Sequence, residues 1–233
     1  MFWPMFNPTY YLFALPALLL GLYAQYRVRS AYSRYQQIRN RHNITGYEAA
    51  RRMMLVAGLP NIPIEETPGQ LSDHYDPRTK SLHLSQGVAR SPSIAALGIV
   101  AHELGHALQD AEDYVPLRVR TGIVPVVQLG SWLGPIIFLL GMLLQTPDLA
   151  VFGLVLFSAT ALFALVTLPV EFNASSRAVR LLTNSGLVVS EEEERGVRSV
   201  LDAAALTYVA AAIQALSTIL YYVFLLGGFR RRD

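Results

Sequence analysis

The stretch IAALGIVAHELGH, residues 94–106, decides which fold and chemistry this sequence suggests. Its apolar residues favour a buried helix, and its last five residues read His-Glu-x-x-His. Residues four positions apart share one face of a helix, so the imidazoles of His102 and His106 can reach one metal ion. Glu103 lies beside the first histidine, where its carboxylate can accept a proton from water at the metal. This pattern is typical of catalytic zinc sites, and the alternative is an amphipathic helix with two surface histidines.

The composition indicates a membrane protein. Hydrophobic residues make up 52% of the chain and charged residues only 15%, whereas soluble domains carry about 25% charged residues. The formal net charge of +2 argues against a nucleic-acid-binding protein, which needs a strongly basic surface. The chain contains no cysteine, so disulfides are excluded and a zinc ion must be held by histidine and carboxylate groups.

Four apolar segments are expected to span the membrane, because about 20 mostly apolar residues cross a bilayer as a helix. They are residues 6–26, 123–144, 149–170 and 206–226. The first segment is not expected to be a signal peptide, since no basic residue precedes it.

These segments divide the chain into five expected parts. Residues 1–26 form an N-terminal transmembrane helix, 27–122 the region with the His-Glu-x-x-His helix, and 123–170 a transmembrane hairpin. Residues 171–205 form a further helical region, and 206–233 form a C-terminal membrane segment with a basic tail.

Arginines set the expected orientation. Five of them follow the first apolar segment closely: Arg27, Arg29, Arg34, Arg39 and Arg41. The positive-inside rule then places residues 27–122 and 171–205 in the cytoplasm and residues 145–148 outside. The basic tail at residues 230–232 disagrees if the last segment spans fully. That segment then re-enters the membrane or lies along its interface, or the tail is an exception to the rule.

The residues before the histidine helix predict a small sheet. Short strands are expected at 62–65, 71–75 and 81–84, with turn residues at 76–80. A helix is expected to open at Gly46 and to stop at Gly58, and Ser91 or Ser93 is suited to cap the histidine helix, which runs to about Gln109. A small sheet followed by a ligand-bearing helix is the order expected of a zincin. We therefore predict a mostly α membrane protein with about four transmembrane helices and a small α+β, zincin-like catalytic region at the membrane surface.

Glu171 is the predicted third metal ligand, because a catalytic zinc usually takes three ligands from the protein. Two predicted spans separate Glu171 from His106, so both residues return to the same side of the membrane. A carboxylate where a membrane segment ends is costly unless it is solvated, paired or bound to metal. The rival interpretation pairs Glu171 with Arg177 or Arg180. The acidic run at residues 191–194 is expected to be a solvated first helical turn.

Four stretches of this chain resemble the YugP-type neutral zinc metallopeptidases of bacterial membranes. They are VAHELGHALQ (100–109), EFNAS (171–175), LSDHYDP (71–77) and LDAAALTYV (201–209), so the resemblance covers nearly the whole chain. The group is similar to the HtpX-like gluzincins and the CAAX-protease zincins, whose third ligand lies in a Glu-x-x-Ala-Asp stretch. That aspartate normally supports a ligand histidine, and Ser175 occupies its position here. The resemblance implies a multi-pass protease of the bacterial cell membrane, with Ser175 and Asn173 supporting the ligands.

The expected reaction is metal-assisted hydrolysis of a peptide bond on the cytoplasmic side, with Glu103 as the general base. A further donor should stabilise the oxyanion, and the candidates are His74, Tyr75 and Tyr208. Neighbouring residues of a strand point to opposite faces, so at most one of His74 and Tyr75 should face the metal by that route.

Peptide or protein substrates and the lipid bilayer are the expected partners, and nucleic acid is not. A peptide could add to an unpaired strand edge at residues 71–75 or 82–85. Two alternatives stay open, namely a non-proteolytic zinc-binding membrane scaffold or regulator, and a zinc amidohydrolase acting on a non-peptide amide. A transporter is disfavoured because the second and third apolar segments contain no ionisable residue.

Overall fold

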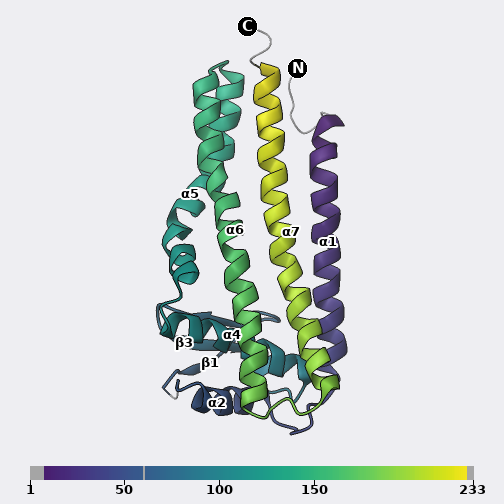
Figure 1. Cartoon of the computed structure of the whole chain (residues 1–233). Helices are drawn as coiled ribbons and strands as arrows, with labels where there is room; N and C mark the ends of the chain where they lie inside the picture. The colour runs from purple at the N-terminus through teal and green to yellow at the C-terminus, as the bar shows by residue number, and fades with distance from the viewer. Residues whose placement is uncertain (1–7, 60, 230–233) are drawn as a thin grey trace. The chain divides into compact units, whose positions relative to one another are not determined.

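The computed structural model describes residues 8–59 and 61–229, and most of them are helical (Figure 1). The chain divides into two compact units. We call the first the helical unit; it comprises Met1–Ala24, Arg118–Leu168 and Thr207–Asp233. We call the second the mixed unit; it comprises Gln25–Leu117 and Pro169–Leu206 and contains the sheet.

Three described helices are long and apolar enough to cross a membrane: α5 (Val115–Leu143), α6 (Pro147–Asn184) and α7 (Glu191–Phe229). The first helix, α1 (Pro8–Gln36), is as long as α5 but contains Pro16, four tyrosines before Arg27 and a basic end, which together lower its mean hydropathy. A fourth spanning helix is therefore not confirmed. The basic tail at residues 230–232 lies outside the described residues.

Close backbone contacts hold α5 against α6 in the helical unit. A Cβ atom on Gly153 would clash with the amide nitrogen of Phe138, and one on Gly134 would lie 2.9 Å from the carbonyl oxygen of Gly153. Small residues let apolar helices approach in this way. In the same unit the ring of Phe138 stacks on that of Tyr222 in α7 at 4.2 Å between centroids.

Two helices continue beyond the apolar segments that predicted them. The apolar segment expected to end at residue 170 is part of α6, which runs through Pro169 to Asn184. An interior proline removes one backbone hydrogen bond and crowds the carbonyl four residues before it, yet the helix continues through Pro169. Glu171 is therefore a residue within a helix and not one that follows a helix end. Likewise α7 begins at Glu191, well before the predicted apolar segment. Hydropathy marks where the surroundings of a helix change, which is not where the helix ends.

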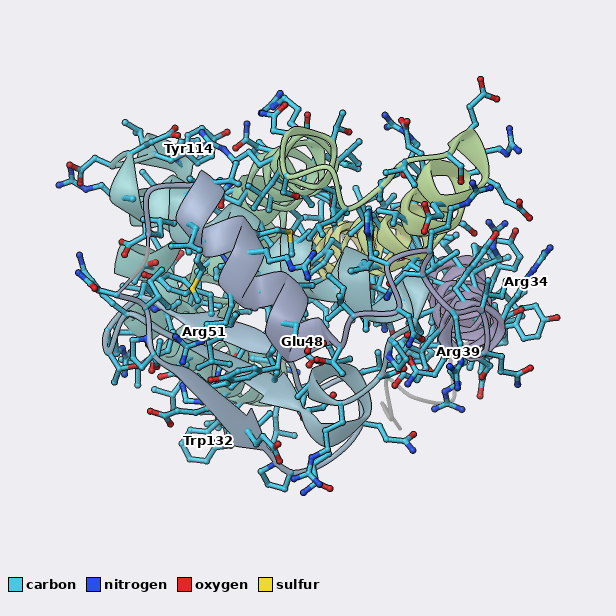
Figure 2. All side chains as sticks on the ribbon, turned by 90° about the horizontal axis from the view of Figure 1, so that it is seen from below. Arg34, Arg39, Glu48, Arg51, Tyr114 and Trp132 are labelled. Atoms are coloured by element: carbon cyan, nitrogen blue, oxygen red, sulfur yellow. The ribbon has the colours of Figure 1, made fainter. Side chains whose placement is uncertain are left out.

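In the mixed unit, α2 (Gly46–Val56) has the predicted start and stop. Thr45 and Glu48 form a reciprocal capping box, and Gly58 takes the left-handed φ of 71° that ends the helix. Arg34 and Arg39, from the basic run, are exposed and extend outward at the end of α1 (Figure 2).

The sheet has the strand order β1-β3-β2, with β1 (Ile64–Thr67), β2 (His74–Asp76) and β3 (Ser81–Ser85). β3 pairs parallel with β1 and antiparallel with β2, so the predicted edge at residues 82–85 is the buried centre of the sheet. β2 is shorter than predicted, since Leu71 takes a φ of 54° that no extended strand accommodates. β1 and β2 are the edge strands.

A short helix, α3 (Gln86–Ala89), leads into α4 (Ile94–Ala111), which carries the His-Glu-x-x-His residues. Ser93 caps α4 as predicted, because its hydroxyl accepts a hydrogen bond from the amide of Ala96. The helix is buried along most of its length and packs against α2, α3 and the sheet. Most of its apolar residues, among them Leu97, Val100 and Leu104, are fully buried. The ligand-bearing helix is thus the central element of the mixed unit.

Candidate metal centre

His102 and His106 project from one face of α4 toward Glu171, which comes from α6. The Nε2 atom of His102 lies 3.1 Å from Glu171 Oε2, and Nε2 of His106 lies 3.6 Å from the same oxygen. One ligand atom from each of the three residues lies within 4.8 Å of the other two. Glu171 is only 2% exposed, so its carboxylate is brought to the histidines inside the protein. This group can hold a metal ion.

The donor set and its spacing fit zinc. Two imidazole nitrogens and one carboxylate oxygen are typical ligands of a catalytic zinc, and they leave a fourth position open. With zinc–ligand bonds of about 2.0–2.1 Å, two ligands of a tetrahedral site lie about 3.4 Å apart. The two distances to Glu171 Oε2, 3.1 Å and 3.6 Å, bracket that value.

Gly105 allows α4 and α6 to approach closely enough for Glu171 to reach both histidines. A Cβ atom at this position would lie 2.5 Å from the carbonyl oxygen of Ala174 and 3.2 Å from its Cα atom. Backbone atoms cannot rotate away as a flexible side chain can, so any larger residue must separate the two helices.

Replacing Gly105 with alanine is expected to lower the free energy of unfolding by about 1–3 kcal/mol and to weaken zinc binding. Gly98→Ala is the matched control on the same helix, because its Cβ atom would meet Val197 Cγ1 at 3.6 Å, an ordinary contact. Both changes gain the same helix propensity. Chemical denaturation and zinc titration of the two variants measure the difference, and equal zinc affinities would show that the close approach is unimportant.

Each ligand histidine has a polar neighbour at its other ring nitrogen. Ser175 Oγ lies 3.2 Å from Nδ1 of His102, and Gln109 Oε1 lies 3.0 Å from Nδ1 of His106. Asn173 does not contact a ligand directly, and its Oδ1 atom accepts a hydrogen bond from Gln109 instead. Partners of this kind orient metal-bound imidazoles.

The rival interpretation paired Arg177 with Glu171, but Arg177 pairs with Glu112 instead. Its guanidinium lies 2.6 Å from Glu112 Oε2, and this bond lowers the pKa of Glu112. Arg180 donates to the hydroxyl of Ser176. The Glu171 carboxylate makes ion-pair contacts with His102 and His106.

The side chain of Glu103 extends from α4 to the edge strand β2. Its Oε2 atom accepts a hydrogen bond of 3.0 Å from the backbone amide of Tyr75 in β2. Burial raises the pKa of the Glu103 carboxyl, and the neighbouring histidines partly offset this effect. A dication on the ligands would lower that pKa further, because positive charge favours the carboxylate. Burial also lowers the pKa of His106, but hydrogen bonding to Glu171 and the charge of Glu103 outweigh it and the net pKa is raised.

The three predicted oxyanion donors occupy different surroundings. The hydroxyl of Tyr75 donates to Asp110 Oδ2 at 2.8 Å, and burial together with that bond raises the pKa of Tyr75. The ring of His74 stacks on His83 at 4.5 Å between centroids. Tyr208 belongs to the helical unit, whereas the ligands belong to the mixed unit. A role in catalysis stays a prediction for all three.

Sequence reasoning missed Gln109. It follows Ala107 and Leu108 in α4 and is fully buried. A signal was available, since Gln109 follows His106 by one helical turn and is a polar residue on the buried face of α4. An amide at such a position needs hydrogen-bond partners.

Comparison with known proteins agrees with this geometry. Residues 10–227 match the family described as "Putative neutral zinc metallopeptidase". The chain is also 44% identical over 211 residues to the protein named "Putative membrane protease YugP" from Bacillus subtilis (strain 168), covering 91% of this chain and 93% of the relative. No solved structure matches the chain. A family match over nearly the whole length, together with this identity, shows that the chain belongs to the neutral zinc metallopeptidase family.

Proposed function

We propose that this protein is a membrane-embedded, zinc-dependent endopeptidase that acts at the cytoplasmic surface of the bacterial cell membrane. In this proposal His102, His106 and Glu171 hold the zinc, and Glu103 is the general base. The observation that carries it is the convergence of the three ligand atoms within 4.8 Å, beside a glutamate that the sheet edge holds in position.

Zinc at this site would polarise the scissile carbonyl and make water acidic enough to react near neutral pH. Glu103 accepts the proton of the attacking water and returns it to the leaving amine. The Tyr75 amide holds one carboxylate oxygen, so the carboxylate stays in one orientation during both transfers.

β2 is the proposed platform for an extended substrate. It is an edge strand, and its Tyr75 amide points to Glu103 on α4. A peptide that lies along this edge would therefore run past the general base, while the Tyr75 amide stays bonded to Glu103 Oε2. The central strand β3 cannot serve, because both its edges are already paired.

Membrane proteins or misfolded proteins are the proposed substrates. Glu171 lies only a few residues beyond Leu168, where α6 leaves the helical unit. The arginines after the apolar part of α1 support a cytoplasmic position for residues 27–122 by the positive-inside rule.

The test compares one cleavable sequence in three settings: in a transmembrane host in liposomes, in an unfolded soluble chain, and in a folded soluble domain. The proposal predicts faster cleavage of the first two, because only an accessible, extended segment can pair with β2. Cleavage at equal rates in all three, with no dependence on detergent or lipid, would contradict the proposed substrate class. A protein that holds zinc yet cleaves none of them would instead be a zinc-binding scaffold.

A further inference from the structure

We infer that Gln109, Asn173 and Arg177 are positioning residues that fix the ring tautomer and orientation of His106 toward the metal. None of the three is a ligand. The inference rests on the proposed zinc site and adds to it the way in which one ligand is prepared for binding.

The three residues form a continuous chain of hydrogen bonds that ends on His106. Arg177 Nε donates to Asn173 Oδ1 at 2.7 Å. Gln109 Nε2 donates to the same oxygen at 3.0 Å and to the carbonyl oxygen of Val170 at 2.9 Å. Gln109 Oε1 lies 3.0 Å from Nδ1 of His106.

The direction of every bond in this chain follows from two fixed groups, the Arg177 guanidinium, which only donates, and the Val170 carbonyl, which only accepts. A guanidinium can only donate, so the Asn173 atom facing it must be the carbonyl oxygen. That oxygen and the Val170 carbonyl are both acceptors, so the Gln109 atom facing them must be the amide nitrogen. Gln109 therefore presents its carbonyl oxygen to His106, and Nδ1 of the ring must carry the proton.

A neutral imidazole carries one proton, so a proton on Nδ1 leaves the lone pair on Nε2. Nε2 is the atom of His106 that lies 3.6 Å from Glu171 Oε2 in the candidate metal centre. The chain of hydrogen bonds thus presents a ready lone pair at the metal position.

Outer contacts keep the chain in place. The guanidinium of Arg177 also lies 2.6 Å from Glu112 Oε2 at the end of α4 and 5.8 Å from the centre of the Tyr114 ring. Gln109 is fully buried, so water does not compete for its amide. The hydrogen bonds of Arg177 and Gln109 therefore link the C-terminal end of α4 to α6.

His102 is supported differently. Its Nδ1 atom faces Ser175 Oγ at 3.2 Å, and a hydroxyl can rotate to donate or to accept. Ser175 therefore does not select a tautomer, whereas Gln109 does. This asymmetry predicts that zinc affinity depends more on the Gln109 chain than on Ser175.

The test compares two replacements of Asn173 of nearly equal size. Asn173→Asp keeps an oxygen that accepts from both Arg177 and Gln109, whereas Asn173→Leu removes it. We expect Asn173→Leu to raise the zinc Kd by about 10–100-fold and Asn173→Asp to stay close to wild type. The readouts are competition with a chromogenic chelator and the visible spectrum of the cobalt-substituted protein. The spectrum should change only in Asn173→Leu.

Arg177→Met and Arg180→Met provide a second, independent pair. Arg180 lies one turn further along α6, is exposed and donates only to Ser176 in the described contacts, so its loss should leave the zinc Kd unchanged. Arg177→Met should raise the Kd. Thermal unfolding of the metal-free proteins controls for simple loss of folding.

Two results would overturn the inference in distinguishable ways. If the wild-type protein binds zinc and Asn173→Leu matches Asn173→Asp in Kd and in cobalt spectrum, the positioning role is wrong while the proposed function stands. If the wild-type protein binds no zinc, the proposed function fails and the inference fails with it.

Discussion

Replacing Glu103 with glutamine is expected to reduce peptide hydrolysis by a factor of about 10²–10⁴ while the protein keeps its zinc. Glutamine has the shape of glutamate. Its carbonyl oxygen can still accept the hydrogen bond that the Tyr75 amide donates to Glu103 Oε2 in the wild type. The amide cannot take up the proton of the attacking water. The loss should therefore appear in kcat, because binding of an extended peptide does not use that proton.

Glu66→Gln is a suitable control for this experiment. Glu66 pairs with Arg90 at the surface, and exposed ion pairs contribute little. Zinc content and kcat are measured side by side for the two variants and the wild type. Full activity of zinc-loaded Glu103→Gln would show that another group is the base, and loss of zinc from it would assign Glu103 to metal binding instead.

Replacing Glu171 with alanine is expected to remove both zinc and activity. The carboxylate supplies the only proposed ligand from outside α4, and its Oε2 atom lies close to both histidines. Losing a hydrogen-bond partner of a ligand typically weakens metal binding by about 10–100-fold, and losing the ligand itself should weaken zinc binding by more. Glu171→Gln, which keeps the size of the side chain, separates loss of the ligand from creation of a cavity.

Thermal unfolding measures this loss without relying on activity. A ligand that binds only the folded protein at about 100 times its Kd adds about 2.7 kcal/mol to the free energy of unfolding. Zinc should therefore raise the Tm of the wild type and of Glu191→Ala, which removes an exposed carboxylate. It should leave the Tm of both Glu171 variants unchanged. A zinc-dependent rise in Glu171→Ala equal to that of the wild type would identify a different third ligand.

The local part of the site could be predicted from the sequence because helical geometry relates residues that are close in the chain. His102, Glu103 and His106 share a helix, so their spacing alone predicts a common face. Ser93 and Gly58 carry local signals for a helix start and a helix end, and both predictions were confirmed. Glu171 required an additional argument, namely that an even number of spans returns the chain to the same side.

Non-local contacts could not be predicted in this way. Arg177 and Glu112 lie 65 residues apart in sequence, and their pairing follows from the packing of α6 on the end of α4. Glu193 is a second case: the acidic run was expected to be solvated, but this residue is buried and accepts a hydrogen bond from the amide of Arg41. Nothing in the composition of either segment distinguishes these residues from an exposed charge.

The strand boundaries show a third kind of limit. The alternating pattern predicted a strand over residues 71–75, but β2 covers only His74–Asp76 because Leu71 adopts a turn conformation. The carboxylate of Asp73 accepts hydrogen bonds from the amide and the hydroxyl of Ser85, which tie the residues before β2 to the end of β3. Short strands depend on such side-chain bonds, which pattern alone does not reveal.

X-ray absorption at the zinc edge of the purified wild-type protein tests the central claim most directly. It identifies the bound metal, its amount per chain and its coordinating atoms. The account predicts one zinc ion per chain, bound by two imidazole nitrogens and a carboxylate oxygen at about 2.0–2.2 Å, with an open position for water. A wild-type protein that cleaves peptides at its full rate with no zinc bound would contradict it.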